Sequence, residues 1–191
     1  MLLKKGFSFI ANRWWIFALT FVVVMLYINL SNILKVFYPI PHHELIERYA
    51  SEYEIDPLLV AAMINVESKF STDAVSPQGA SGLMQLMPET AKWIAKKIGK
   101  PYDHNRLFDP EYNLTLGTWY ISELRREFNN NLVLILAAYN GGRGNVKIWL
   151  EENQWQGNIE TISQIPFPET RNYVSKVLRR YRIYEFIYRD K

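Results

Sequence analysis

The sequence of 191 residues contains no cysteine. A disulfide scaffold, a thiolate nucleophile and a zinc site built on cysteine are therefore excluded. The histidines do not form the H-E-x-x-H arrangement that binds zinc from a helix; they are His42, His43 and His104. We therefore expect no metal and no other cofactor.

The sequence also lacks alternation and repetition. No alternating pattern of apolar and polar residues of the kind that indicates a β-strand continues for more than four positions, and there is no internal repeat. A chain of this length suits one compact domain with an appendage. We predict an all-α protein with a single soluble domain.

Acidic residues are missing from the first 35 positions, which hold four of the 22 basic residues. The rest of the chain carries 18 basic and 19 acidic residues, a formal charge of −1. The net charge of +3 therefore comes from the N-terminal segment. It gives no support for a nucleic-acid partner, and we expect none.

No charged residue lies between Trp14 and Leu34. As a helix, this run is long enough to cross a hydrocarbon layer of roughly 30 Å. Trp15 near one end and Tyr27 near the other suit the two membrane interfaces. A cleaved signal peptide is the alternative, but the run exceeds a typical signal-peptide apolar region and no clean small-x-small site follows it. We predict a single transmembrane signal anchor over residues 14–34.

Basic residues set the predicted orientation of this anchor. Lys4, Lys5 and Arg13 precede the apolar run, whereas only Lys35 follows it closely. By the positive-inside rule, residues 1–13 stay in the cytoplasm and everything after the run is exported. We therefore predict a single-pass protein of the cell membrane whose domain lies on the extracytoplasmic side.

The exported part begins with a stiff linker over residues 35–43, in which Pro39 and Pro41 favour extended backbone. The domain is predicted over residues 44–188. Two Asp-Pro pairs within it combine a helix N-cap with a proline at the first helical position. Together with the apolar periodicity, they predict helices over about residues 42–54, 56–68, 88–99, 109–128, 132–139, 145–151 and 170–188.

Glu67 ends a helix in which nearly every position before Asn65 is aliphatic. Apolar surroundings and the negative end of the helix dipole both disfavour the charged carboxylate, so both should raise the pKa of Glu67. A carboxyl group that keeps its proton near neutral pH can act as a general acid on a glycosidic oxygen. The alternative is a glutamate that is solvated at the surface or paired with an arginine.

Four short blocks then follow one another along the chain. They are Glu67-Ser68, Gly82-Leu83-Met84-Gln85, Ala138-Tyr139-Asn140 and residues 165–174, which read I-P-F-P-E-T-R-N-Y-V. In this order, with Ser76 and Gly79-Ala80 between the first two, they resemble the catalytic domain of the soluble lytic transglycosylases, the goose-lysozyme-like family 23 of glycoside hydrolases. The resemblance spans residues 44–188 and implies a lysozyme-like fold.

The resemblance implies a peptidoglycan lytic transglycosylase that cuts glycan strands between N-acetylmuramic acid and N-acetylglucosamine during cell-wall remodelling. Most glycosidases use two carboxylates, but this family needs one. Glu67 would protonate the glycosidic oxygen and then take the proton of the muramic acid C6 hydroxyl, which closes a 1,6-anhydro ring. The alternatives are a muramidase of the same fold, in which water attacks C1, and a cell-wall binding protein without turnover. Whether an envelope protein acts as a partner stays open.

The resemblance also implies substrate-binding residues. Ser76 matches a serine near the sugar's N-acetyl or lactyl group, although it can equally cap the turn before Pro77. Met84 would line the sugar groove, unless it is a core residue. Gln85 is an amide in an apolar segment, and in the family it contacts substrate close to the acid.

Three further positions complete the expected site. Tyr139 and Asn140 end a buried helix beside glycines that let a ligand approach the backbone. Tyr139 resembles the family tyrosine that stabilises charge near C1 or the acid. Glu169 matches a cleft glutamate that could raise the pKa of Glu67 by repulsion, or it is a negative charge that suits a helix N-terminus.

Basic residues crowd the last predicted helix. A solvated face accounts for them, and the alternatives are binding to anionic lipid or to an acidic cell-wall polymer. These residues are Arg171, Lys176, Arg179, Arg180, Arg182 and Arg189.

Overall fold

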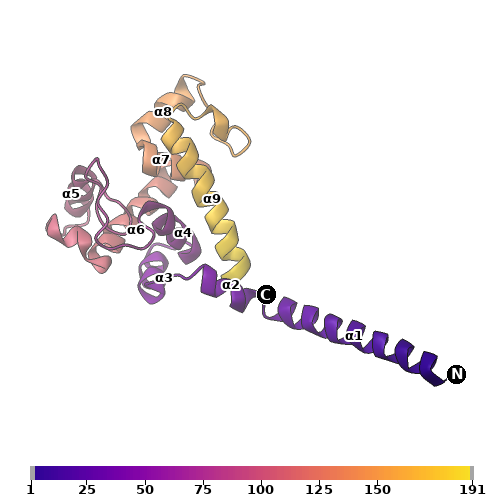
Figure 1. Ribbon diagram of the computed structural model, residues 1–191. Coiled ribbons are helices and arrows are strands. Elements are labelled where there is room, and N and C mark those ends of the chain that lie inside the picture. Colours follow the sequence, from indigo (N-terminus) through magenta and orange to yellow (C-terminus); the bar gives the residue numbers. More distant parts are fainter. Residues whose placement is uncertain (1–2, 190–191) are drawn as a thin grey trace. The chain divides into compact units, whose positions relative to one another are not determined.

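The computed structural model describes the backbone of residues 3–189 and the side chains of residues 14–189. Its regular structure is helical (Figure 1). Within residues 3–189 the β-type pairing is confined to isolated bridges of Ser81 with Val75 and Leu86, so the predicted all-α class is confirmed. The elements are α1 (Leu3–Ile28), α2 (Leu30–Phe37), α3 (His43–Glu52), α4 (Pro57–Glu67), α5 (Pro88–Lys97), the 3-10 helix η1 (Asn105–Phe108), α6 (Pro110–Glu127), α7 (Leu132–Gly141), α8 (Arg143–Glu151), the 3-10 helix η2 (Ile162–Gln164) and α9 (Pro168–Tyr188).

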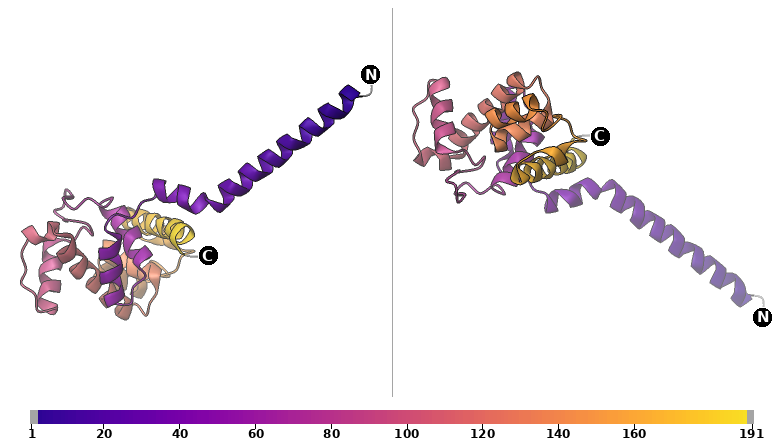
Figure 2. Two further views of the ribbon diagram at one scale, coloured as in Figure 1. Left: turned by 90° about the horizontal axis from the view of Figure 1, so that it is seen from below. Right: turned by 90° about the horizontal axis from the view of Figure 1, so that it is seen from above.

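The chain forms two compact units, of which residues 40–185 are the larger and are called the domain below. Helix α6 is the central element of the domain, because it packs against α3, α5, α7 and η1. Helices α3 and α4 form one adjacent pair, and α7 and α8 form another (Figures 1 and 2). These helices are therefore arranged around the buried helix α6.

Two helices of the domain, α4 and α7, are apolar on all sides, and both are buried as predicted. Residues 59–64 of α4 are all buried. Asp56 caps α4 by accepting a hydrogen bond from Leu58 N at 2.8 Å, with Pro57 at the first helical position. Asn131 caps α7 in the same way. Because neither helix has a polar face, each must be enclosed by other elements, which fixes where its C-terminal end lies.

Helices α7 and α8 are separated by Gly142 alone, which has a left-handed φ of 87°. The sequence predicted a longer gap, from residue 139 to residue 145. The two helices follow each other this closely because Asn145 of α8 bonds to the end of α7. Its Nδ2 donates to Gly141 O at 2.7 Å and satisfies a carbonyl there. Glycine adopts a positive φ without steric cost, so the chain changes direction here without a loop.

The N-terminal segment contains two helices, α1 and α2, where one unbroken helix over residues 14–34 was predicted (Figures 1 and 2). The break is at Asn29, whose Nδ2 donates to Met25 O at 2.8 Å. Among the described residues no single helix is long and apolar enough to cross a membrane, whereas Trp14–Ile28 and Leu30–Phe37 meet that criterion together, with a bend of 56°.

Most large apolar side chains of this segment are exposed. Trp15 is 76% exposed and Phe37 is 72% exposed. Within the same unit, Tyr188 Oη donates to Tyr38 O at 2.7 Å, and the Lys35 ammonium group lies 5.4 Å from the centre of the Tyr188 ring. A contiguous apolar surface of this kind is rare on proteins that are surrounded by water alone.

Candidate active site

Glu67 is the last residue of α4, so the buried helix places its carboxyl group at a fixed point of the domain. Burial raises the pKa of Glu67 to about 7; the Tyr173 hydroxyl acts against this increase and the negative charge of Glu169 adds to it. The predicted effect of apolar surroundings on this carboxyl is therefore confirmed. Near neutral pH, Glu67 exchanges readily between its acid and its base form.

Tyr173 and Glu169 both come from the first half of α9. Tyr173 Oη is buried and makes no hydrogen bond of regular geometry with any described residue, yet it is close enough to lower the pKa of Glu67 as a donor. Contacts of this kind are often long before substrate binds and tighten afterwards. Burial raises the pKa of Tyr173 well above its usual value, and the Glu67 charge adds to that increase. The phenol therefore stays neutral and keeps its proton.

Tyr139, near the end of α7, lies close enough to Glu67 for the two side chains to interact electrostatically. Burial raises the pKa of Tyr139 well above its usual value, with contributions from the charge of Glu67 and from Tyr120. Its Oη donates to Met84 O at 2.9 Å. The structure thus brings Tyr139 and Glu67 together as expected. Because its hydrogen is bonded to Met84, the Tyr139 oxygen can turn its lone pairs toward the site.

One buried side chain, Asn113 of α6, fixes the loop between α4 and α5. Its Oδ1 accepts from Met84 N at 2.8 Å. Its Nδ2 donates to Ser81 O at 3.0 Å and to Leu107 O at 2.8 Å. Gly82 lies against this amide with a φ of 77°, and a Cβ there would overlap the Leu107 carbonyl. Three backbone groups are therefore positioned by a single amide, and glycine is required beside it.

Met84 contributes to the site through its backbone. Its side chain is fully buried and its sulfur lies against Gly117 of α6, where a Cβ would overlap it. The structure therefore places the Met84 side chain in the core, the alternative stated above, and not along a groove. Its carbonyl, held by Tyr139, is the part that faces the other site residues.

Ser76 and Gln85 stabilise the loop itself. Ser76 Oγ accepts from Ala80 N at 3.0 Å, which is the turn-capping role. Gln85 Nε2 donates to Ala74 O at 3.0 Å and to Gly82 O at 2.9 Å, so both of its amide hydrogens are used inside the loop. Contact of either side chain with substrate stays a prediction.

Asn140 joins α7 to α9. Its Oδ1 accepts from Thr170 Oγ1 at 2.8 Å, and Thr170 is buried. This bond fixes the first turn of α9, which carries Glu169. The electrostatic effect of Glu169 on Glu67 is present, whereas binding of substrate by Asn140 and Glu169 stays a prediction.

Three residues of this arrangement had no role in the sequence analysis: Tyr173, Asn113 and Ser68. Ser68 Oγ donates to Leu83 O at 2.8 Å and ties the end of α4 to the loop. An asparagine within an apolar stretch of a long helix is a signal that could have indicated Asn113, because a buried amide needs partners. Tyr173 belongs to the last of the four sequence blocks, residues 165–174, but the block does not indicate which of its side chains lies near Glu67.

The arrangement provides one carboxyl group that can give and take a proton near pH 7, with two neutral phenols close to it. An exposed carboxylate, Glu169, adds negative charge. Among the described residues no group of three or more histidine, aspartate or glutamate side chains is arranged to hold a metal ion. The chemistry that these residues support is general acid–base catalysis.

Glu67→Gln should make the protein more stable than its parent above pH 7. The folded state binds the Glu67 proton up to about pH 7, whereas the unfolded chain loses it near its ordinary value of 4.5. The parent therefore loses stability as the pH rises between these values. The loss is at most about 3 kcal/mol, because solvent reaches part of the site and weakens the effect. Urea unfolding at pH 4.5 and pH 8.5 measures the difference. Glu160→Gln, at an exposed position, is the control, and equal stability of parent and Glu67→Gln at pH 8.5 contradicts the prediction.

Comparison with known proteins gives a consistent picture. Residues 44–162 match the family described as the transglycosylase SLT domain. The soluble lytic murein transglycosylase of Escherichia coli K12 is 35% identical over 185 residues, which cover 94% of this chain and 28% of that protein. The membrane-bound lytic murein transglycosylase C of Photorhabdus laumondii is 33% identical, over 70% of this chain and 43% of that protein.

A solved structure has a similar fold. The 70-kDa soluble lytic transglycosylase of Escherichia coli superimposes with a TM-score of 0.76 and 37% identity, over 83% of this chain and 26% of that one. A 70-kDa soluble lytic transglycosylase in complex with bulgecin A gives the same TM-score, with 34% identity. These matches confirm the lysozyme-like fold implied by the sequence blocks. The chain spans between about a quarter and less than half of the length of these relatives.

Proposed function

We propose that this chain, which belongs to the transglycosylase SLT domain family, is a peptidoglycan lytic transglycosylase that cuts glycan strands between N-acetylmuramic acid and N-acetylglucosamine. The observation that supports the proposal most directly is the partly buried carboxyl of Glu67, with a pKa of about 7. A general acid is most effective when its pKa lies near the working pH.

In the proposed reaction Glu67 acts twice. Its proton goes to the glycosidic oxygen as the bond from that oxygen to C1 of the muramic acid breaks. The carboxylate then takes the proton of the C6 hydroxyl of the same sugar, and O6 bonds to C1. No water is consumed, and Glu67 ends as it began. Because the nucleophile belongs to the substrate, holding the sugar in position replaces a second carboxylate.

The neighbouring residues suit this sequence of steps. Tyr139 directs its proton to Met84 O, so its oxygen can stabilise the positive charge that develops at C1. Tyr173 can donate to the Glu67 carboxylate once the proton has left. Glu169 favours the return of a proton to Glu67, because its charge opposes ionisation. We assign substrate contacts to Ser76, Gln85, Asn140 and Glu169 as expectations from the family.

We also propose that the N-terminal helices hold the domain at the outer face of the cell membrane. The exposed apolar side chains of Trp14–Ile28 and Leu30–Phe37 support this, and so does the bent pair that these helices form. Lys4, Lys5 and Arg13 would keep the N-terminus in the cytoplasm. A domain placed in this way would act on the cell wall next to the membrane.

Digestion of purified peptidoglycan tests the reaction. The full chain should release fragments with 1,6-anhydro-N-acetylmuramic acid ends, each one water lighter than the product of hydrolysis, and mass spectrometry of the fragments measures this. Addition of borohydride, which reduces hydrolytic ends and leaves anhydro ends unchanged, gives an independent readout. Release of reducing ends alone would establish a muramidase instead.

A further inference from the structure

Helix α2 has one apolar face and one polar face. Its apolar face has the helical spacing i, i+3, i+4 and i+7, and it consists of Leu30, Ile33, Leu34 and Phe37. The opposite face is polar and consists of Ser31, Asn32 and Lys35, whereas Val36 is the one apolar residue outside the first face. No residue of α2 is buried, so no described part of the chain covers the apolar face. A helix with this pattern suits the boundary between water and lipid.

By its length, helix α1 can cross a membrane without α2. It has 26 residues, and about 20 helical residues cross a hydrocarbon layer of roughly 30 Å. The stretch 9–28 of α1 has this length and includes one charged residue, Arg13, near the end that is predicted to face the cytoplasm. Arginine is tolerated near the end of a span. The polar residues of α2 therefore need not enter the hydrocarbon.

The angle between the two helices fits this arrangement. The axis of α2 departs from that of α1 by 56°. Transmembrane helices are tilted on average by about 20° from the bilayer normal, so a tilt in the same direction would bring α2 to within about 15° of the membrane plane. The apolar face of α2 can then rest on the lipid along its whole length.

The end of α2 carries side chains that favour a membrane interface. Tyr38 follows α2 directly and accepts, through its backbone oxygen, a hydrogen bond of 2.7 Å from Tyr188 Oη. The Lys35 ammonium group lies 5.4 Å from the centre of the Tyr188 ring. All three residues belong to the same compact unit. Tyrosine rings prefer the level of the lipid headgroups, so the last residue of α9 joins α2 at a place that suits this level.

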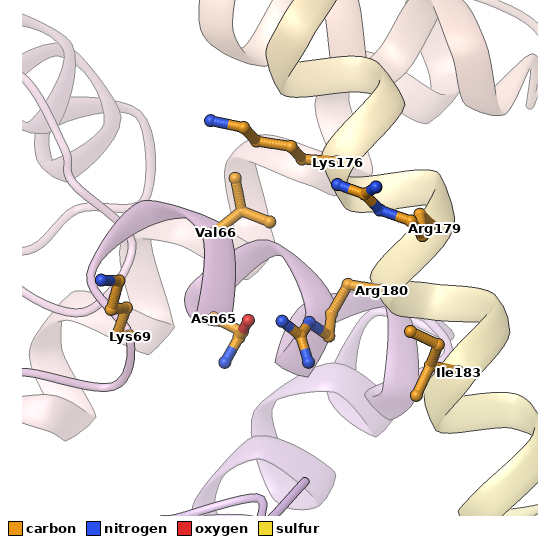
Figure 3. A pocket seen from close by; sticks show the side chains of 7 residues that line it. All are labelled: Asn65, Val66, Lys69, Lys176, Arg179, Arg180 and Ile183. Atoms are coloured by element: carbon orange, nitrogen blue, oxygen red, sulfur yellow. The ribbon is translucent and has the colours of Figure 1, made fainter.

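Most basic residues of α9 belong to the domain and not to this unit. Three of them line a concave surface between α4 and α9 (Figure 3), and they are Lys176, Arg179 and Arg180. Val66 lies on the α4 side of that surface and directly precedes Glu67, so the surface belongs to the candidate active site. Near Tyr188 the positive charge comes from Lys35 and Arg189, and it suits anionic headgroups.

We propose that α2 lies in the outer interface of the membrane that α1 crosses, with its apolar face on the acyl chains and Lys35 among the headgroups, and that Tyr188 holds the last turn of α9 there. This inference rests on the membrane attachment proposed above. The chain passes between this unit and the domain twice, after Pro39 and after Glu185. The domain would then be attached at the membrane surface by two segments of the chain instead of by a single linker.

Labels on single cysteines test the position of α2, because the parent chain contains no cysteine. Each residue from Leu30 to Phe37 is replaced in turn by a cysteine that carries a nitroxide, in the full chain reconstituted in vesicles of phosphatidylglycerol and phosphatidylethanolamine. Accessibility to oxygen, which enters lipid, and to a nickel chelate, which stays in water, measures depth. Labels on the apolar face should share a depth of about 5 to 10 Å, and labels at Ser31, Asn32 and Lys35 should lie in water. A depth that changes steadily along α2, without a helical period, overturns the proposal.

Two further labels separate failure of this proposal from failure of membrane attachment. Val22→Cys, in the apolar part of α1, should carry the deepest label, and Glu160→Cys, at an exposed position of the domain, should carry a label in water. A deep label at Val22 without a helical period in α2 means that only the position of α2 is wrong. A label in water at Val22 means that membrane attachment and this proposal are both wrong. Cleavage of peptidoglycan by the same preparations is measured separately and tests the reaction alone.

Hydrogen exchange tests the contact of α9 with α2. Tyr188→Phe removes the hydroxyl group and keeps the ring. In the vesicle-bound chain it should speed exchange of the last amides of α9 about fivefold, because opening of this turn no longer breaks the bond to Tyr38. Tyr27→Phe, at an exposed position of α1, is the matched control and should leave these amides unchanged. Equal exchange in the parent and in Tyr188→Phe would show that Tyr188 does not hold α9 at the interface.

Discussion

Replacing Glu67 by glutamine should lower the rate of glycan cleavage by at least about a thousandfold. Glutamine has nearly the same shape but cannot donate the proton that the leaving oxygen needs or take the one from the C6 hydroxyl. General acid–base catalysis by one group contributes about 10² to 10⁴ in rate, and here both transfers depend on the same group. Release of soluble fragments from purified peptidoglycan, followed over time, measures the effect.

The matched controls for this variant separate chemistry from binding and folding. Glu160→Gln removes a carboxylate from an exposed position and should cut at the parental rate. Sedimentation with purified peptidoglycan should retain Glu67→Gln about as well as it retains the parent. Cleavage by Glu67→Gln at a rate close to that of the parent would show that another group is the acid.

Replacing Asn113 by alanine should destabilise the domain by roughly 3 kcal/mol, because it leaves the N–H of Met84 and the carbonyls of Ser81 and Leu107 without their partner. A buried polar group left unpaired costs about 1 to 3 kcal/mol. Three such groups, partly compensated by water that enters the space, give the expected total. Urea unfolding and the melting temperature measure the loss.

Two controls test the reason for the loss at Asn113. Asn113→Leu keeps the branched shape of the side chain, leaves no cavity and removes every hydrogen bond, so it should be destabilised to a similar degree. Recovery of stability in the leucine variant would mean that the cavity, and not the loss of hydrogen bonds, sets the cost. Asn172→Ala, at an exposed position of α9, should leave stability nearly unchanged.

The elements that carry periodic or capping signals could be predicted from the sequence. Asp56 and Asp109 each cap a helix in front of a proline, as expected, because this local chemistry does not depend on the rest of the fold. The single helix over residues 14–34 was not found, because the structure breaks it at Asn29, between α1 and α2. A hydropathy pattern averages over such a run and does not indicate a break at one residue.

Some residues of the candidate site could be predicted from the sequence and others could not, and the difference has a physical reason. Glu67 could be found because its burial follows from the apolar helix that precedes it. The part played by Met84 could not, because the sequence does not say whether a side chain or a backbone carbonyl faces the site. Tyr173 lies 106 positions from Glu67 along the chain. Only the packing of α9 places its hydroxyl near the acid.

The contact between Gly117 and Met84 has a consequence for engineering. Glycine inside a helix is usually a target for thermostabilisation, because alanine is favoured by about 1 kcal/mol in that position. Here the added methyl group would meet the Met84 sulfur and push on the residue whose carbonyl orients the Tyr139 hydroxyl. The customary glycine-to-alanine replacement at position 117 would therefore displace a residue of the candidate site, and a stabilised version of this chain should keep glycine there.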